Sequence, residues 1–242
     1  MPEPRPDPLA DLASLEGVGS AMAAARDGVD ALLRDRGLRR TAPEWTAESL
    51  LRGAHASAVL DGSGSTLEEL RAGTADPTAA AAVRISTDLL SLVPVLAHSP
   101  RQVFARLHTL AAKGEVDEDQ LGRPRGGVGA ERLSGLAQLL LEPTSAPALV
   151  TAAVVHAELH AVAPFVSHNG LVARAAERLV LVARGVDPTS LTVPEAGHLA
   201  LRAQYESNLR GYAEGGLAGV HGWLLYAAEG YTAGAQASPL RG

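Results

Sequence analysis

Apolar residues recur at helical spacing along most of this chain, and no run sustains the apolar–polar alternation of a half-buried strand. The apolar residues, 46% of the sequence, are mainly alanine, leucine and valine, whereas aromatic residues make up only 3%. Alanine is the best helix former, and its small side chain lets helices approach closely. The pattern therefore predicts an all-α fold, and 242 residues are enough for a substantial core.

Start and stop signals divide the chain into helices with short connections. Thr66 opens a helix that Gly73 ends, and Asp76-Pro77 opens the next. Residues 113–129 lose the helical period and are rich in glycine, arginine and acids, which predicts an exposed loop or a short hairpin. We expect the other helices over 15–36, 41–60, 101–112, 131–141, 146–162, 169–184, 195–212 and 217–231.

Charge, cysteine content and hydropathy exclude several classes of function. The net charge of −6 offers no basic surface to nucleic acid or to an anionic membrane, so we expect neither as a partner. The absence of cysteine excludes disulfides and thiolate chemistry. Residues 1–8 have no apolar signal-peptide core, and no stretch of about 18 apolar residues lacks charge or histidine. We therefore expect a cytoplasmic protein without a transmembrane helix.

The segment from His156 to Arg174 combines features of an anion-binding turn. An apolar helix ends at Pro164, a short loop contains Asn169-Gly170, and an amphipathic helix follows. A glycine-containing turn at a helix N-terminus exposes N–H groups and the positive end of the helix dipole. Ordinary helix–loop–helix turns share these features, so the turn alone leaves both interpretations open.

The spacing of this segment resembles the signature of the Fic (Fido) family, H-P-F-x-[D/E]-G-N-G-R-x-x-R. The match aligns on Pro164-Phe165, Asn169-Gly170 and Arg174, and Ala152-Ala153-x-x-His156 fits the helix that precedes the signature. The resemblance implies a Fic-like helical bundle, with a short β-hairpin flap as an option.

Two upstream regions extend the resemblance in the family's own order. Leu107-His108 followed by Gly122-Arg-Pro-Arg125 looks like the family's helix and its substrate-clamping flap. Ser57-Ala-Val-Leu-Asp61-Gly62 resembles the inhibitory-helix motif [S/T]-x-x-x-E-[G/N], with Asp in place of Glu. Flap arginines Arg123 and Arg125 would then clamp a phosphate or an acidic peptide, although exposed loop arginines are often simply solvated.

The resemblance also divides the chain into regions. We predict a disordered proline-rich tail over 1–14 and an N-terminal helical region with an inhibitory-type helix over 15–75. The Fic-like core would span 76–232, and a flexible tail would follow over 233–242.

The chain departs from the signature at the residues that carry the family's chemistry. The motif histidine, a general base worth about 10²–10⁴-fold in rate, is replaced by Ala163. The acidic residue that holds Mg²⁺ is Ser167, and a neutral hydroxyl is a poor ligand for that ion. These changes predict a protein without conventional AMP-transferase activity and without bound Mg²⁺, with ATP as a candidate ligand.

Two further changes affect the loop itself. His168 stands at a motif glycine, where its side chain crowds the approach of a phosphate, and Leu171 replaces a phosphate-facing arginine. Asn169, Gly170 and Arg174 remain, and together with Ser167 they are the predicted ligand-binding residues.

Asp61 and Arg174 occupy positions that pair in the family, where the inhibitory glutamate blocks productive placement of a nucleotide. A bidentate Asp–Arg pair would tie the N-terminal helix to the core. Asp61 would also fit a simpler role as a residue that ends its helix beside Gly62.

Eight histidines invite a metal hypothesis. His156 and His160 are four residues apart on one helical face, but no carboxylate or third histidine is placed by sequence to complete a site, so we predict no metal. His160 and His168 flank the missing base and are the candidates for a relocated one.

The sequence thus predicts a regulatory or nucleotide- or phosphate-ligand-binding protein with a degenerate Fic-like site. Two alternatives stay open: a nucleotidyl or phosphoryl transferase that uses His160 or His168, and a protein–protein interaction module with a vestigial site. A homodimer and a protein partner are compatible with all three.

Overall fold

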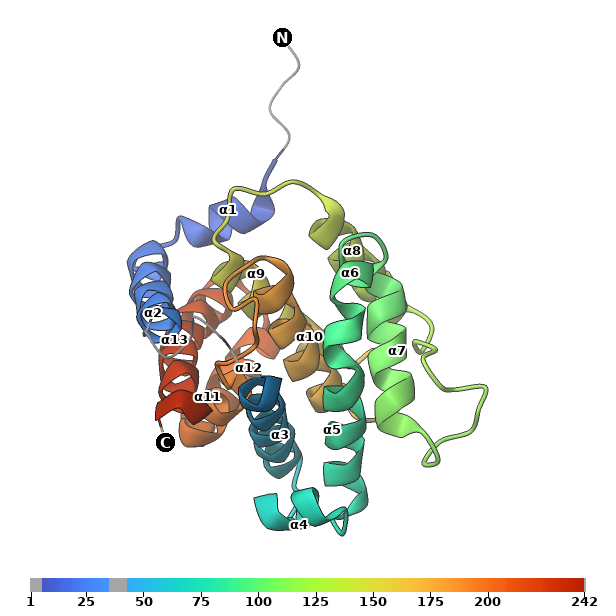
Figure 1. Ribbon diagram of the computed structural model, residues 1–242. Coiled ribbons are helices and arrows are strands. Elements are labelled where there is room, and N and C mark those ends of the chain that lie inside the picture. The colour runs from blue at the N-terminus through green and yellow to red at the C-terminus, as the bar shows by residue number, and fades with distance from the viewer. Residues whose placement is uncertain (1–5, 35–42, 242) are drawn as a thin grey trace.

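The computed structural model describes residues 6–34 and 43–241, and these contain helices and turns but no strand (Figure 1). The all-α prediction is confirmed. The first half of the chain forms α1 (Pro8–Ala13), α2 (Val18–Leu33), α3 (Pro43–Leu60), α4 (Leu67–Ala72), α5 (Pro77–Asp88), the 3₁₀ helix η2 (Leu89–Leu92), α6 (Val93–Leu96) and α7 (Pro100–Ala112). The second half forms α8 (Val128–Leu141), α9 (Ala148–Val162), α10 (Asn169–Ala183), α11 (Pro194–Ala200), α12 (Arg202–Glu214), α13 (Leu217–Gln236) and the 3₁₀ helix η3 (Pro239–Arg241).

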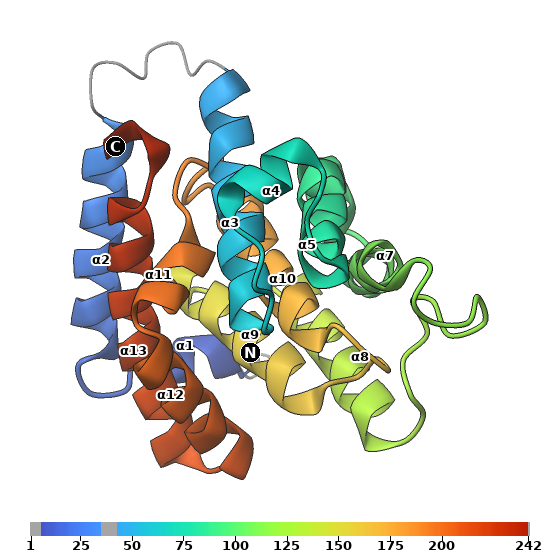
Figure 2. The same cartoon turned by 90° about the horizontal axis from the view of Figure 1, so that it is seen from below.

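Helices α9 and α10 pack against each other at the centre of the bundle (Figures 1 and 2). The sequence of α9 is apolar on every face, and its residues 149–157 are all buried, as expected for a helix surrounded by others. Helices α3, α5 and α7 lie on one side of this pair, and α11, α12 and α13 lie on the other. Helix α2 packs along α13, so an early and a late helix of the chain lie side by side in the fold.

The predicted caps between α3 and α5 are present. Thr66 and Glu69 form a reciprocal capping box, and Gly73 ends α4 with a positive φ of 71°. The carboxylate of Asp76 accepts hydrogen bonds from the Ala79 N–H and from the hydroxyl of Ser63. These local bonds set the chain direction between α3, which Asp61 directly follows, and the rest of the core.

The expectation of a disordered tail over 1–14 is wrong for residues 8–13, which form α1; residues 1–5 lie outside the described part of the chain. Leu9 is buried at 1% exposure. The carboxylate of Asp7 accepts bonds from the Ala10 N–H (3.1 Å), the Thr144 hydroxyl (2.8 Å) and the Ser145 N–H (2.8 Å). One buried leucine and one multiply bonded carboxylate thus hold a segment whose composition suggested disorder.

The expected flexible tail over 233–242 instead contains the end of α13, a short turn and η3, and Gly242 lies outside the described residues. Helix α13 continues to Gln236, and Ala235 is buried. The Gly234 carbonyl accepts a hydrogen bond from the Val193 N–H (2.9 Å), which ties the end of α13 to the start of α11. The helix expected over 195–212 is divided at Leu201, whose φ and ψ of −109° and 31° leave the helical range.

The helical run of residues 77–96 is, by length and composition alone, apolar enough to cross a membrane. Within the fold, 39% of its apolar window is buried, and its helices pack against α3, α7 and α10. Core helices of globular proteins meet the same criterion, so this run does not by itself indicate a membrane span.

Candidate functional site

The loop between α9 and α10 is shaped by its own side chains. Helix α9 ends at Val162 because Ala163 adopts the left-handed conformation (φ 42°) and precedes a proline. Oδ1 of Asn169 accepts a hydrogen bond from the Phe165 N–H (2.9 Å), and Nδ2 donates one to the Phe165 carbonyl (3.0 Å). Asn169, a predicted ligand-binding residue, therefore uses its amide to hold the loop.

The segment of residues 113–127 covers this loop as a series of turns, and the suggested hairpin is absent from this described stretch. The Arg125 N–H donates to the Pro164 carbonyl (2.7 Å), and its guanidinium donates to the Ala163 carbonyl (2.7 Å). The hydrogen-bonding groups of Arg125 are thus bonded to the loop rather than to a second strand. Arg123, the other predicted clamp residue, is exposed.

His108 of α7 joins the segment of residues 113–127 to the loop between α9 and α10. Its Nδ1 accepts the Gly122 N–H (3.0 Å), and its ring stacks on the buried Phe165 with centroids 4.5 Å apart. Burial, with a smaller contribution from the charge of His168, lowers the pKa of His108 to about 4. The imidazole is therefore neutral at pH 7, as its acceptor role requires.

His168 is oriented by a carboxylate from the covering segment. It precedes α10 in the left-handed conformation (φ 54°), and its Nε2 lies 3.0 Å from Oε2 of Glu115. Oε1 of Glu115 lies 3.4 Å from Nη2 of Arg84 on α5. No local signal predicts a partner for His168, because Glu115 is 53 residues away in the chain.

Arg174 is buried, at 1% exposure, and its guanidinium is bonded on several sides. Nε donates to the Ser57 hydroxyl (2.7 Å), Nη2 donates to the Ser57 carbonyl (3.0 Å) and to Asp61, and Nη1 donates to the Tyr205 hydroxyl (3.0 Å). Burial by itself lowers the pKa of Arg174, but the Asp61 charge and the hydrogen bonds outweigh it and raise that pKa. The structure thus brings Asp61 and Arg174 into contact.

The Asp61 carboxylate also rests against Gly170 at the start of α10. A Cβ at Gly170 would lie 2.5 Å from Oδ1 of Asp61, so only glycine leaves room for the carboxylate in this position. The positive end of the α10 dipole and the Arg174 guanidinium therefore face the same negative group. Asp61 acts as an internal anion at the turn where the sequence predicted an anion site.

A pocket of about 340 Å³ opens beside this pair. Its walls come from α3, α9, α10 and α12, and it is lined by Leu60, Asp61, His160, Ala161, Arg174, Tyr205, Glu206, Leu209, Arg210 and Ala213. Burial, and to a lesser extent the charge of Arg174, lowers the pKa of His160, so its imidazole is neutral at pH 7. The volume lies in the range of about 300–1,000 Å³ that is usual for small-molecule sites.

Two other predicted positions face inward. Leu171 is buried at 1% exposure and packs in the core. The Ser167 hydroxyl is buried and has no hydrogen-bond partner among the described residues. Neither side chain offers a charge to a ligand.

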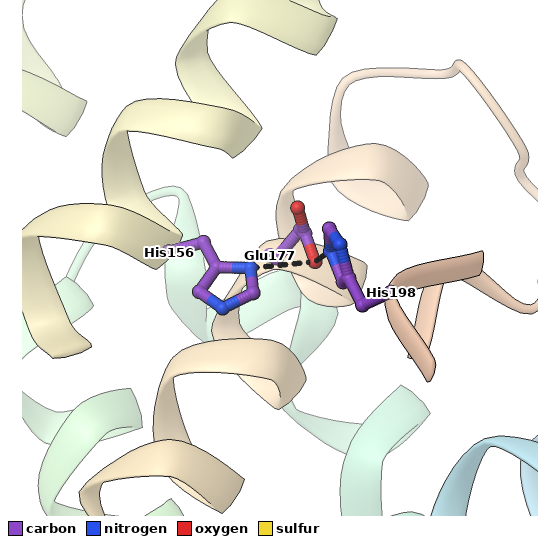
Figure 3. A group of neighbouring side chains, drawn as sticks. All are labelled: His156, Glu177 and His198. Atoms are coloured by element: carbon purple, nitrogen blue, oxygen red, sulfur yellow. Dashed lines mark hydrogen bonds and ion pairs between the residues drawn. The ribbon is translucent and has the colours of Figure 1, made fainter. Parts of the chain in front are cut away.

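A buried polar network continues from Arg174 into the core, where Figure 3 shows its inner group of His156, Glu177 and His198. The Tyr205 hydroxyl, which accepts from Arg174, is 2.9 Å from Nε2 of His156. Oε2 of Glu177 lies 2.9 Å from Nδ1 of His156 and 3.0 Å from Nε2 of His198. Burial lowers the pKa of His156 to about 4. Burial raises the pKa of Glu177, but the two imidazoles lower it further, so the carboxyl is ionised.

Sequence reasoning missed Glu177 and His198 and paired His156 with the wrong histidine. His160 lies on the pocket wall, whereas His156 faces α10 and α11. The available signal was Glu177 itself, which with Arg178 interrupts the apolar residues that follow Arg174. Only the packing of three helices shows that a carboxylate and a second imidazole complete the group around His156.

No model of a known protein family matches the chain, and a search of curated proteins finds no match. Solved structures do match. A Fic family protein from Desulfovibrio desulfuricans G20 has a TM-score of 0.75 and 17% identity, covering 92% of this chain and 74% of its own. A fragment of Fic-1 from C. elegans has a TM-score of 0.68 and 18% identity, covering 95% of this chain and 72% of its own. A variant of that fragment has a TM-score of 0.67 and 20% identity with the same coverage. The chain therefore has the Fic fold.

Proposed function

We propose that this protein is a regulatory protein with the Fic fold that binds a nucleotide or another phosphorylated ligand beside Arg174. It does not carry out conventional protein AMP transfer. The position that the sequence resemblance assigns to the general base is Ala163, whose methyl group accepts no proton. The loop also does not fit Mg²⁺. Ser167 offers one neutral oxygen, and the carboxylate of Asp61, which contacts the start of α10, is already paired with Arg174.

The observation that carries the proposal is the Asp61 carboxylate between Arg174 and Gly170. A guanidinium and a helix N-terminus form an anion site, and Asp61 supplies the anion from within the chain. Asp61 is 23% exposed, whereas Arg174 is 1% exposed, so the acidic partner is the one that can leave toward solvent. A phosphate would then take the place of the carboxylate.

The adjoining pocket supports a ligand larger than phosphate. It offers the apolar side chains of Leu60 and Leu209 together with the guanidinium of Arg210. This combination suits an organic group that carries negative charge, such as a nucleotide. Asp61 would then compete with the ligand, which makes α3 a regulatory element of this site.

Calorimetric titration with ATP, with and without Mg²⁺, tests the proposal on wild type, Asp61→Ala and the control Asp30→Ala. Asp30 pairs with Arg26 on α2 and has a comparable exposure of 31%. We expect binding to strengthen at least tenfold in Asp61→Ala only, with little dependence on Mg²⁺. Adding Gly170→Ala to Asp61→Ala should reduce the affinity again, because the new Cβ fills the space that the Asp61 carboxylate occupied. Absence of binding by ATP and by inorganic phosphate at millimolar concentration in all variants would refute the proposal.

A second candidate function, group transfer with a relocated base, is favoured by the contact between His168 and Glu115. A carboxylate that orients an imidazole is the usual arrangement of a general base, and Nδ1 of His168 remains for the substrate. Incubation with labelled ATP and candidate proteins would then show a modification that His168→Ala abolishes and Glu115→Gln weakens. Equal labelling by wild type and His168→Ala would exclude this role for His168.

A further inference from the structure

Three metal-ligand side chains meet in the core, away from the loop and its pocket. His156 of α9, Glu177 of α10 and His198 of α11 each place one ligand atom within 4.8 Å of the others (Figure 3). All three side chains are completely buried. Two imidazoles and one carboxylate are a common ligand set for divalent first-row transition metals.

The direction of the His156 nitrogen is the first argument for an ion. Nδ1 lies 2.9 Å from Oε2 of Glu177, yet it makes no hydrogen bond with that oxygen or with any other described group. At this distance, a missing bond means that the nitrogen points off the line to the oxygen. Two tetrahedral ligands at about 2.1 Å from one zinc ion would be about 3.4 Å apart, so this pair of atoms needs to separate only by a few tenths of an ångström to share an ion.

The remaining atoms of the three side chains are held as the outer atoms of metal ligands usually are. Nε2 of His156 is bonded to the Tyr205 hydroxyl (2.9 Å), and Nδ1 of His198 is bonded to the Tyr226 hydroxyl (2.9 Å). Oε1 of Glu177 accepts from the Tyr231 hydroxyl (2.9 Å). Such outer bonds fix the rotation of each ligand and leave the inner atoms facing one another.

Charge is the third argument. Among the described residues, Glu177 forms no ion pair with a lysine or arginine. The guanidinium in the same network, that of Arg174, is already paired with Asp61. A buried carboxylate without a full cationic partner is costly, and a divalent ion would compensate its charge.

We infer that His156, Glu177 and His198 form a structural site for a divalent transition-metal ion, with Zn²⁺ as the ion to test. The ligands are Nδ1 of His156, Nε2 of His198 and Oε2 of Glu177. Oε1 of Glu177 adds a fourth donor if the carboxylate binds through both oxygens while Oε1 still accepts from the Tyr231 hydroxyl. The two imidazoles must move together by several tenths of an ångström to reach zinc–nitrogen distances of about 2.0–2.1 Å. Since the site has no exposed surface, the ion enters as the chain folds and joins α9, α10 and α11.

Metal content tests the inference independently of any nucleotide. The chain is purified after expression in zinc-supplemented medium, and bound metal is measured by mass spectrometry. We expect about one ion per chain in wild type and in the control His160→Ala, which lies on α9 outside the group. We expect a loss of at least tenfold in His198→Ala and Glu177→Ala. Refolding with Co²⁺ should give visible absorption bands, and refolding with a chelator should lower the melting temperature.

The wild-type measurements decide the question even where a variant fails to fold. Wild type that is metal-free after purification, lacks cobalt bands and melts at the same temperature with and without Zn²⁺ would overturn the inference. The group would then be a hydrogen-bond network in which Glu177 is the shared acceptor. Equal metal content in wild type and a folded His198→Ala protein would also overturn it, since the ion would lie elsewhere.

Discussion

Two acidic side chains lie in one continuous network but in opposite environments. Asp61 is 23% exposed, borders a pocket and pairs with a full cation, Arg174. Glu177 is completely buried, and its polar contacts among the residues that the structure describes are two imidazoles and a tyrosine hydroxyl. Tyr205 connects the two regions, because its hydroxyl accepts from Arg174 and contacts His156.

Because of this difference, a ligand can replace Asp61 beside Arg174, whereas Glu177 must keep its buried partners for the chain to fold. When Asp61 leaves, water or a ligand can reach the pocket, so the cost of separating the pair is partly recovered. When Glu177 is removed, the His198 imidazole and the Tyr231 hydroxyl lose their acceptor in the dry core, and nothing replaces it. We therefore expect ligands to act at Asp61 and stability to depend on Glu177.

The largest expected effect is that of Glu177→Leu. The substitution leaves Nε2 of His198 and the Tyr231 hydroxyl without an acceptor and removes the carboxylate beside Nδ1 of His156, and each buried orphan costs about 1–3 kcal/mol. We expect the free energy of unfolding to fall by about 4 kcal/mol in urea denaturation. A loss below about 1 kcal/mol would mean that the core group tolerates rearrangement, which would break the comparison.

Tyr205→Phe tests the link between the two regions. The change removes a buried hydroxyl and leaves Nη1 of Arg174 and Nε2 of His156 without that partner, at an expected cost of about 2 kcal/mol. A double-mutant cycle with Asp61→Ala should give a coupling energy above about 0.5 kcal/mol. Additive losses would show that the two regions behave independently despite the shared hydroxyl.

Acid should destabilise the fold through two neutral histidines. The pKa values of His108 and His156 are each lowered to about 4, so the unfolded chain binds their protons first as the pH falls below about 6.5. Stability should therefore decrease between pH 7 and pH 5, by about 1–2 kcal/mol for each histidine. His108→Asn should remove the part of this pH dependence that comes from His108 and leave the part that comes from His156. An unchanged pH dependence of the unfolding free energy in His108→Asn would contradict the low pKa of His108.

The smallest expected effect on stability is that of Asp61→Ala. Arg174 keeps its bonds to Ser57 and Tyr205, and water in the adjoining pocket can replace the carboxylate, so we expect a loss of about 1 kcal/mol. Denaturation beside the control Asp30→Ala measures the loss. A cost as large as that of Glu177→Leu would show that Asp61 is a permanent strut rather than an exchangeable partner.

Much of the fold was predictable because helix signals are local. The capping box of Thr66 and Glu69, Pro77 in the first turn of α5 and the apolar sequence of α9 each act within a few residues. The two ends of the chain were not predictable in this way. Helix α1 depends on Asp7 reaching Thr144, and the end of α13 depends on Gly234 meeting Val193. Composition near the termini carries no trace of such distant partners.

The candidate site divides along the same line. The sequence by itself predicted the turn at Asn169-Gly170 and the contact between Asp61 and Arg174, and the resemblance predicted that Ala163 and Ser167 replace the usual base and metal ligand. Only the tertiary structure decided that Asn169 holds the loop, that Glu115 orients His168, and that Glu177 and His198 complete the group around His156. The physical reason is that side-chain order along one helix follows from its period, whereas the meeting of atoms from α9, α10 and α11 depends on how those helices pack.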